Sequence, residues 1–326
     1  MANPRKPFPR FISNNRRALG SFVILIVVYL VVFMSNPAVW MNPETISSVA
    51  VTFPIVAFLV VPLTFMVTGG DIDLSFPAVI GMTAWAFALT VKAGWDPVVG
   101  FFVAIVVGLL LGAIVGTVVV FGGLSPLITT IGANFFLRGL INLGAVGYSI
   151  ALPIYVRDTV FYNLYSGTKL VGIPVQSIWA VVFVILGWFL YNRHAFGVHV
   201  HCVGDNPSSA LEMGINVRRT RVAVYIFVGF GSALAGVLSV LVSMVWWPTT
   251  GEGFLLTALA SVFVGGTPAW AGVGTVVGGA IGATIVRLLE PGIIAAGLSG
   301  FYTQLVYGLT IILSLLGHRF NGERHR

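Results

Sequence analysis

Val67-Thr68-Gly69-Gly70-Asp71-Ile72-Asp73-Leu74-Ser75-Phe76-Pro77 interrupts a long apolar region with two carboxylates, a glycine pair and a proline. A carboxylate near the centre of a bilayer costs roughly 2.5–3.5 kcal/mol on insertion scales, so it faces protein or water. The glycine pair and Pro77 predict a backbone break and a new helix from about Ser75, capped by Asp73 or Ser75. Broken helices that meet near the midplane often form transport sites. The alternative is that both aspartates only cap a tight turn near the membrane surface.

The rest of the chain is predominantly apolar. Of its 326 residues 57% are hydrophobic and 8% are charged, and its mean hydropathy is +0.99, whereas soluble domains carry about 25% charged residues. We therefore predict an all-α polytopic membrane protein in contact with lipid. The net charge of +7 does not indicate nucleic-acid binding, because the basic residues lie in three short segments between apolar runs. Cys202 is the sole cysteine, which excludes an internal disulfide and a cysteine metal site.

Apolar stretches of about 20 residues mark membrane-spanning helices. We predict ten of them, at 19–36, 46–67, 76–92, 98–121, 126–150, 177–192, 221–245, 254–266, 271–289 and 300–317. The first follows a basic segment like that of a signal peptide, but its apolar run is too long for one, so we keep it as a span.

Lysine and arginine concentrate on one side of the predicted spans, and such residues favour the cytoplasmic side. We therefore expect both termini on the cytoplasmic side of the membrane. The predicted membrane domain then has a cytoplasmic N-terminus at 1–18, an external loop at 151–176, a cytoplasmic loop at 193–220 and a cytoplasmic tail at 318–326.

Two glycine triplets point to an internal repeat. The fourth predicted span contains Gly108, Gly112 and Gly116, and the ninth contains Gly274, Gly278 and Gly282. Small residues four apart let helix backbones approach closely in lipid, so we expect both triplets at helix contacts. If spans two to five correspond to spans seven to ten, the two halves are inverted copies. A chance match is the alternative, because glycine is common in membrane helices.

The cytoplasmic loop contains the signals of a short docking helix. Asn206 suits the N-cap, Pro207 the first helical position, and Gly214 the residue just past the end. A helix this short is not stable in water by itself, so we expect its apolar side to pack against another part of the protein or against a partner. We expect residues Asp205, Asn206, Pro207, Ser208, Ala210, Leu211, Glu212, Met213 and Gly214 to contact a cytosolic partner. The alternative is a loop that lies on its own membrane domain.

The chain lacks the patterns of a nucleotide-binding or catalytic protein. None of its three lysines completes a phosphate-binding loop, and no nucleophile–base pair lies at one membrane depth. The cytoplasmic loop contains three histidines, His194, His199 and His201. We expect their side chains to be solvated, and we predict no metal site. A membrane enzyme is therefore a weak reading.

Four blocks of sequence together resemble the ribose/xylose-type permeases of bacterial ATP-binding-cassette importers, which are related to branched-chain amino acid permeases. The blocks are Gly70–Ser75, Pro126–Leu140, Gly197–Val217 and Val264–Thr275, and the match spans nearly the whole chain. The resemblance implies a ten-span permease that pairs with a second, identical or homologous permease. It also implies two cytosolic ATPases, which hold ATP and Mg²⁺, and an external binding protein. The chain itself would need no cofactor.

Two positions depart from the pattern of this family. Asp71 stands where the family usually has a second glycine, and Leu255 stands where it often has an acidic residue. Both departures fit a chain that works with a non-identical partner.

The leading hypothesis is therefore an importer permease for a small polar solute, most simply a monosaccharide or polyol. Its alternatives are a permease for a nucleoside, vitamin, autoinducer or amino acid, and an ion-coupled transporter that uses Asp71 and Asp73 as ion ligands. We expect the solute pathway to involve Asp71, Asp73, Ser75, Asn134, Arg138 and Thr257. An arginine inside a span is costly unless it is paired or hydrated, and Asn134 lies one helical turn from Arg138.

Overall fold

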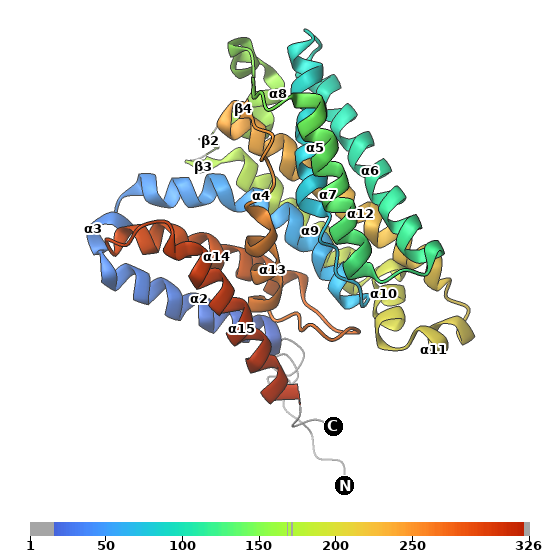
Figure 1. The fold of residues 1–326 in the computed structure, drawn as a ribbon. Coiled ribbons are helices and arrows are strands. Elements are labelled where there is room, and N and C mark those ends of the chain that lie inside the picture. The colour runs from blue at the N-terminus through green and yellow to red at the C-terminus, as the bar shows by residue number, and fades with distance from the viewer. Residues whose placement is uncertain (1–15, 168, 171, 323–326) are drawn as a thin grey trace.

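The computed structural model describes residues 16–167, 169–170 and 172–322, with side chains described between 18 and 317. Residues 1–15 of the N-terminal segment and 323–326 of the tail therefore lie outside the described part. Within it the chain is mainly helical, which confirms the predicted all-α class (Figure 1).

Ten helices form the body of the described chain. They are α2 (Arg16–Ser35), α4 (Pro43–Thr68), α5 (Phe76–Lys92), α6 (Pro97–Gly122), α7 (Pro126–Ala145), α9 (Val175–Asn192), α12 (Val217–Ser243), α13 (Phe254–Val264), α14 (Val276–Ala295) and α15 (Tyr302–Gly322). Seven of them are long and apolar enough to cross a membrane, while α5, α13 and the apolar part of α15 are shorter. The chain is thus a polytopic helical membrane protein.

Several helix boundaries differ from the predicted spans; for example, α14 extends to Ala295 rather than 289 and α15 to Gly322 rather than 317. Helix α7 ends at Ala145 rather than near 150, because Val146 (φ 50°) and Gly147 (φ 77°) take the left-handed conformation. Helix α14 begins at Val276 rather than 271, where the Thr275 side chain caps it by accepting a hydrogen bond of 3.1 Å from the Gly278 N–H.

Short elements connect the long helices. After α2 comes α3 (Pro37–Trp40), and the connector before α9 contains β1 (Ile150–Ala151), η1 (Ile154–Asp158), α8 (Val160–Tyr162), η2 (Asn163–Gly167), β2 (Lys169–Leu170) and β3 (Ile173–Pro174). Strand β1 pairs antiparallel with β4 (Val245–Trp246), which follows α12, and β2 pairs antiparallel with β3. The loop between α9 and α12 holds two helices, α10 (Ala195–Asp205) and α11 (Pro207–Glu212), of which the sequence predicted only the second.

Helices α4 and α12 form the buried centre of the molecule, and α5, α6, α9, α13 and α14 pack around them. Helix α4 keeps its path despite Pro54, which has no N–H to donate to the Ala50 carbonyl. The hydroxyl of Ser177 in α9 donates to that carbonyl instead, at 2.5 Å. Near the end of α4, Phe65 packs edge-on against Tyr191 and Phe227, with ring centroids 5.0 and 5.2 Å apart.

Five of the six predicted glycines lie where one helix meets another. A Cβ at Gly108 or Gly112 would collide with carbonyl oxygens of α12, and one at Gly116 would lie 2.7 Å from the Tyr225 Cβ. In the other triplet, Gly278 and Gly282 meet backbone atoms at the end of α13. The sixth glycine, Gly274, precedes α14 and contacts Thr68 and Tyr191 instead.

Replacing Gly112 with alanine tests the α6–α12 contact. The added methyl group would meet the Tyr225 carbonyl oxygen and, at 3.0 Å, the Ile226 Cα. We expect the free energy of unfolding of the detergent-solubilised protein to fall by about 1–3 kcal/mol, as in overpacked protein cores. Thermal denaturation measures this loss. Gly139→Ala in α7 is the matched control, because nothing lies within 4 Å of its Cβ. Equal stabilities of the two variants would contradict the close contact.

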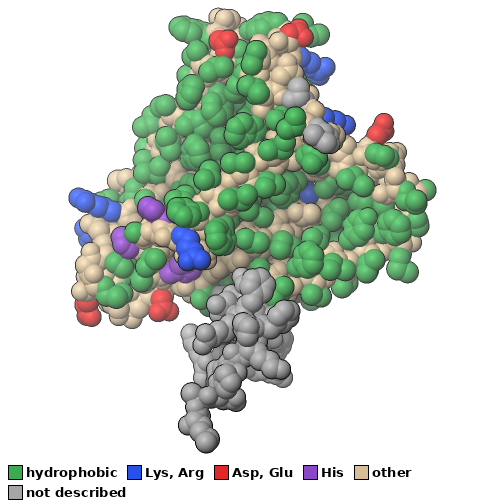
Figure 2. Space-filling view, turned by 180° about the vertical axis from the view of Figure 1, so that it is seen from behind, with side chains coloured by type: hydrophobic (Ala, Val, Ile, Leu, Met, Phe, Trp, Pro, Cys, Tyr) green, Lys and Arg blue, Asp and Glu red, His purple; other side chains and the backbone are tan. Residues whose placement is uncertain are grey.

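Hydrophobic side chains cover most of the face seen in Figure 2, as lipid contact requires. Histidine and charged side chains gather at its lower left, over the end of the molecule that carries α10 and α11 in Figure 1. This end is therefore the more polar one and contains the candidate site described next.

Candidate functional site at the helix break and the docking loop

The break between α4 and α5 has a defined turn geometry. Gly70 adopts φ 92°, its N–H donates to the Val67 carbonyl, and the Asp71 N–H donates to the Met66 carbonyl, both at 3.1 Å. This double hydrogen bond is the Schellman motif that terminates helices at glycine. The predicted break is thus confirmed, and a side chain at position 70 would strain it.

On the far side of the break, Asp73 holds the start of α5. Its Oδ1 accepts hydrogen bonds from the Ser75 N–H at 2.7 Å and from the Ser75 hydroxyl at 2.6 Å, and both residues are buried. Pro77 lies in the first turn of α5, as predicted. The neighbouring Leu74 N–H donates to the hydroxyl of Thr130 in α7, at 3.0 Å. The break is therefore tied to a third helix.

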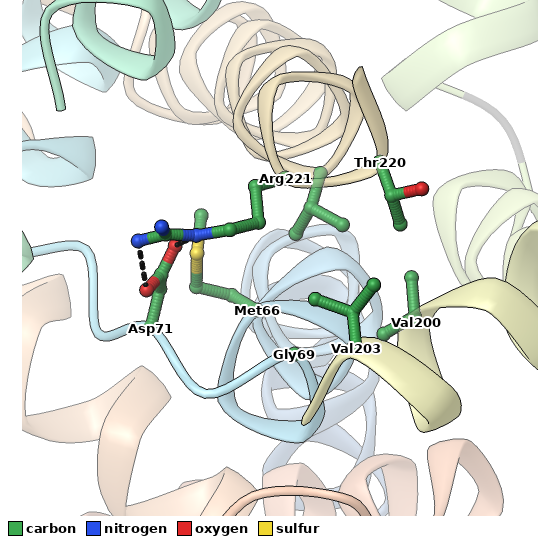
Figure 3. Close-up of a pocket in the computed structure, with 8 residues that line it drawn as sticks. Met66, Gly69, Asp71, Val200, Val203, Thr220 and Arg221 are labelled. Carbon is green, nitrogen blue, oxygen red and sulfur yellow. Dashed lines mark hydrogen bonds and ion pairs between the residues drawn. The ribbon is translucent and has the colours of Figure 1, made fainter. Parts of the chain in front are cut away.

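The first aspartate of the break has a different partner. The Arg221 guanidinium, in the second turn of α12, donates from Nε to Asp71 Oδ2 at 2.9 Å and from Nη2 to Oδ1 at 2.7 Å. Figure 3 shows this pair beside a small apolar pocket that is lined by Met66, Val200 and other residues. Two parallel hydrogen bonds between charged groups fix both position and orientation. Asp71 is thus fully engaged by α12.

Helix α10 packs against the C-terminal end of α4 and against the 265–275 loop that follows α13. The Thr68 carbonyl, at the end of α4, accepts from the Gly272 N–H of the 265–275 loop at 2.8 Å. A Cβ at Gly204 of α10 would collide with both of these backbone groups. His201 of α10 donates from Nδ1 to the Gly272 carbonyl at 3.0 Å. Contrary to the expected solvated loop histidine, His201 therefore joins α10 to the loop before α14.

Helix α11 has the predicted caps. The Asn206 Oδ1 accepts from the N–H groups of Ser208 and Ser209 at 3.0 and 3.1 Å, and Gly214 adopts φ 81° past the helix end. Ala210 packs inward and is fully buried, whereas Leu211 and Met213 are 60% and 63% exposed. Pro207, Ser208 and Glu212 are exposed too, while Asp205 ends α10 against Gly272. An ordered helix thus presents two large apolar side chains outward.

Arg138 of α7 lies against protein. It donates from Nη1 to the carbonyls of Pro248 and Thr250 at 2.6 and 3.1 Å, and from Nη2 to that of Pro77 at 3.4 Å. Its Nε lies 3.4 Å from Glu252 Oε1, and its side chain is 13% exposed. Arg138 therefore joins α7 to the first turn of α5 and to the segment before α13.

The two remaining pathway candidates lie in different places. Asn134 is half-buried one turn from Arg138, and its Oδ1 accepts no hydrogen bond within the described part of the chain. Thr257 is buried in α13 and donates to the Gly253 carbonyl at 3.0 Å. The structure thus gathers Asp71, Asp73 and Ser75 at one break, Asn134 and Arg138 on α7, and Thr257 apart on α13.

Sequence reasoning missed three residues of this region. Arg221 had been counted only as a basic residue on the cytoplasmic side, although an arginine inside an apolar helix already signals a partner. Gly204 and Gly272 lie in two of the blocks that carry the family resemblance, but their role, close backbone contact between segments far apart in sequence, was not predicted.

The fold and these contacts define a multi-pass helical membrane protein with a broken central helix and a structured loop between α9 and α12. The sequence model of the family "Branched-chain amino acid transport system / permease component" matches residues 45–315. The ribose import permease protein of Bacillus subtilis is 31% identical over 299 residues, 91% of each chain. The D-allose transport system permease protein of Escherichia coli is 29% identical over 315 residues, 96% of this chain and 94% of its own. The autoinducer 2 import system permease protein of Salmonella typhimurium is 29% identical over 283 residues, 84% and 83% of the two chains.

The chain therefore belongs to the family of branched-chain amino acid transport system permease components. This finding confirms the resemblance inferred from the motifs. Members of the family are membrane components of transport systems, so the chain is a permease subunit and not an enzyme.

Proposed function

We propose that this chain is the permease subunit of an ATP-binding-cassette importer that moves a monosaccharide into the bacterial cytoplasm. The observation that carries the proposal is the capped helix α11, which exposes Leu211 and Met213 and continues directly from α10, the helix packed on the break. Similarity over most of the chain to permeases named for ribose and allose supports the solute class.

The proposed assembly contains a second permease subunit, two cytosolic ATPases and an external binding protein. ATP and Mg²⁺ bind to the ATPases, and this chain carries no cofactor. Leu211 and Met213 supply the apolar part of the ATPase contact, since burying exposed apolar surface drives association. Asn206, Pro207 and Gly214 fix the shape of the contacting helix.

We further propose ten spans in the inner membrane, made by the seven long apolar helices and the three shorter ones. Both termini, residues 193–220 and the α10–α11 end face the cytoplasm, and residues 151–176 face outward. The concentration of basic residues at the α10–α11 end supports this orientation.

Cysteine labelling tests the orientation. In a Cys202→Ser background, Asp158→Cys and Ser208→Cys each introduce one exposed thiol at opposite ends of the molecule. A membrane-impermeant maleimide applied to intact spheroplasts should label the cysteine at position 158 and leave the one at 208 unlabelled. Rupturing the membrane should make both reactive. Labelling at position 208 in intact spheroplasts would contradict the proposed orientation.

The two halves are proposed to be inverted copies, with α4 to α7 corresponding to α12 to α15. Helix α5 packs on α6 and α7, and α13 packs correspondingly on α14 and α15. Between the halves, α12 packs on α5 and α6, and α4 packs on α13 and α14. These matching contacts are what an inverted repeat predicts, and they support the proposal.

We propose that Asp71, Asp73, Ser75, Asn134, Arg138 and Thr257 line or shape the solute path. Asn134 is the best candidate for direct contact, because its buried Oδ1 has no partner within the described chain although the residue is partly exposed. Asp71 and Arg138 act indirectly, through the segments that their charged groups hold together.

An ion-coupled transporter is less well supported. Each aspartate proposed as an ion ligand already has a protein partner: Asp71 pairs with Arg221, and Asp73 accepts two hydrogen bonds from Ser75. A free cation would have to displace these contacts.

A solute screen tests the proposed substrate. The complex with its ATPase and binding protein, reconstituted in proteoliposomes, should hydrolyse ATP faster when a monosaccharide such as ribose or allose is added. A response to autoinducer 2 and to no monosaccharide would favour the solute of the third relative instead and overturn the sugar assignment.

A further inference from the structure

The ion pair between Asp71 and Arg221 has a property that distinguishes it from the other ion pairs of the described chain. Both carboxylate oxygens are engaged, at 2.9 and 2.7 Å. The other two ion pairs, Arg138–Glu252 and Arg287–Glu290, are longer contacts, at 3.4 and 3.9 Å, to half-exposed glutamates. By contrast, the Asp71 side chain is 7% exposed and that of Arg221 is 27% exposed.

The pair adds a charged contact between the break and the base of α12, a helix that also packs on α4 and α5. Asp71 is the residue at which the chain leaves the turn that ends α4, and its own N–H is held by the Met66 carbonyl. Arg221 lies just beyond α11, in a helix start capped by Asn216, whose Oδ1 accepts from the Arg219 N–H at 3.0 Å. Only the short segment between α11 and α12, which ends in the Asn216 cap, separates the docking loop helix from Arg221. A displacement of α11 would therefore also move Arg221.

The surroundings make the pair costly to break. Met66, Val200, Val203 and Val224 line the pocket beside the two charged groups (Figure 3). Apolar side chains make up most of this lining, to which only Thr220 adds a hydroxyl, so separating the pair would leave the buried Asp71 carboxylate poorly solvated. The break and the base of α12 are thus held together unless the whole region rearranges.

We propose that Asp71 and Arg221 form a positioning latch, which passes movement of the docking loop to the break between α4 and α5 during transport. This inference rests on the proposed importer function. Transmission between distant sites requires a rigid element that both sites bias, and the bidentate pair makes the break and the base of α12 one such element.

A pair of apolar substitutions separates a latch from a simple structural bridge. Removing one partner leaves a buried charge unpaired, whereas replacing both by apolar groups is often tolerated. We therefore expect Asp71→Asn and Arg221→Gln to lose stability. The double variant Asp71→Ala/Arg221→Met should assemble with its ATPase at near wild-type yield.

The decisive readout is solute transported per ATP hydrolysed by the reconstituted full complex. For the double variant this ratio should fall at least fivefold, within the range of typical coupling effects. Arg221→Lys keeps the positive charge but loses the planar guanidinium that makes two parallel hydrogen bonds. Its ratio of solute transported to ATP hydrolysed should therefore lie between those of wild type and the double variant.

A double variant whose ratio stays within twofold of wild type overturns the latch. If the double variant does not assemble, an unchanged ratio in Arg221→Lys overturns it in the same way. Absence of ATP-dependent transport in the wild-type complex would instead refute the proposed function, so the two failures are distinguishable.

Discussion

Arg138→Met is expected to prevent stable folding or abolish transport. The substitution removes the donors to the carbonyls of Pro77, Pro248 and Thr250, together with the contact to Glu252. Each buried polar group left without a partner costs about 1–3 kcal/mol, so we expect a loss of at least about 3 kcal/mol. Thermal denaturation in detergent and uptake in proteoliposomes measure the effect.

Two further variants define the cause of this loss. Arg138→Lys retains the charge, but an ammonium group lacks the planar guanidinium geometry that bonds several carbonyls at once. This variant should therefore be more stable than Arg138→Met and less stable than wild type. Arg157→Met, which removes an exposed arginine of η1, should behave like wild type. Wild-type stability of Arg138→Met would show that the carbonyl contacts do not hold the two segments together.

Leu211→Asp is expected to disrupt assembly with the ATPase. It places a charge in the proposed apolar contact without altering a membrane helix, so membrane insertion should be unaffected. Central interface residues commonly contribute 2 kcal/mol or more, which corresponds to about a 30-fold loss of affinity. Co-purification of the ATPase and solute-stimulated ATP hydrolysis provide the measurement.

The matched control for this variant is Ile154→Asp, since Ile154 is also strongly exposed but lies in η1, in the connector before α9. It should leave ATPase binding unchanged. Gly214→Val should reproduce part of the Leu211→Asp defect, because φ 81° is strained for a β-branched residue. Normal ATPase binding and normal coupling in Leu211→Asp would rule out α11 as the contact.

Local sequence signals predicted the turns of this protein well. The glycine pair at 69–70 ends α4, and Asn206 and Gly214 bound α11. These features depend on residues within a few positions of one another, so the residue types alone determine them. The predicted side-chain cap of α5 was wrong, because Asp73 bonds to Ser75 just before the helix and no described side chain accepts from its first turn.

Contacts between segments far apart in the chain could not be predicted from these local signals. Arg221 lies 150 residues from Asp71, and the acceptors of Arg138 are backbone carbonyls, which every residue type offers. Helix α10 was missed because its cap, His194, is an uncommon cap residue, which accepts from the Phe196 N–H at 3.1 Å. Tertiary packing therefore decides what the site residues contact, and Arg221 was missed for this reason.

The dependence of uptake on its energy source tests the central proposal most directly. Proteoliposomes containing the permease complex enclose ATP and Mg²⁺ with the ATPase facing inward, and the binding protein and labelled monosaccharide are added outside. We predict uptake that requires ATP hydrolysis and persists when ionophores collapse proton and sodium gradients. Uptake that stops with the ionophores and continues without ATP would contradict the importer and favour an ion-coupled transporter.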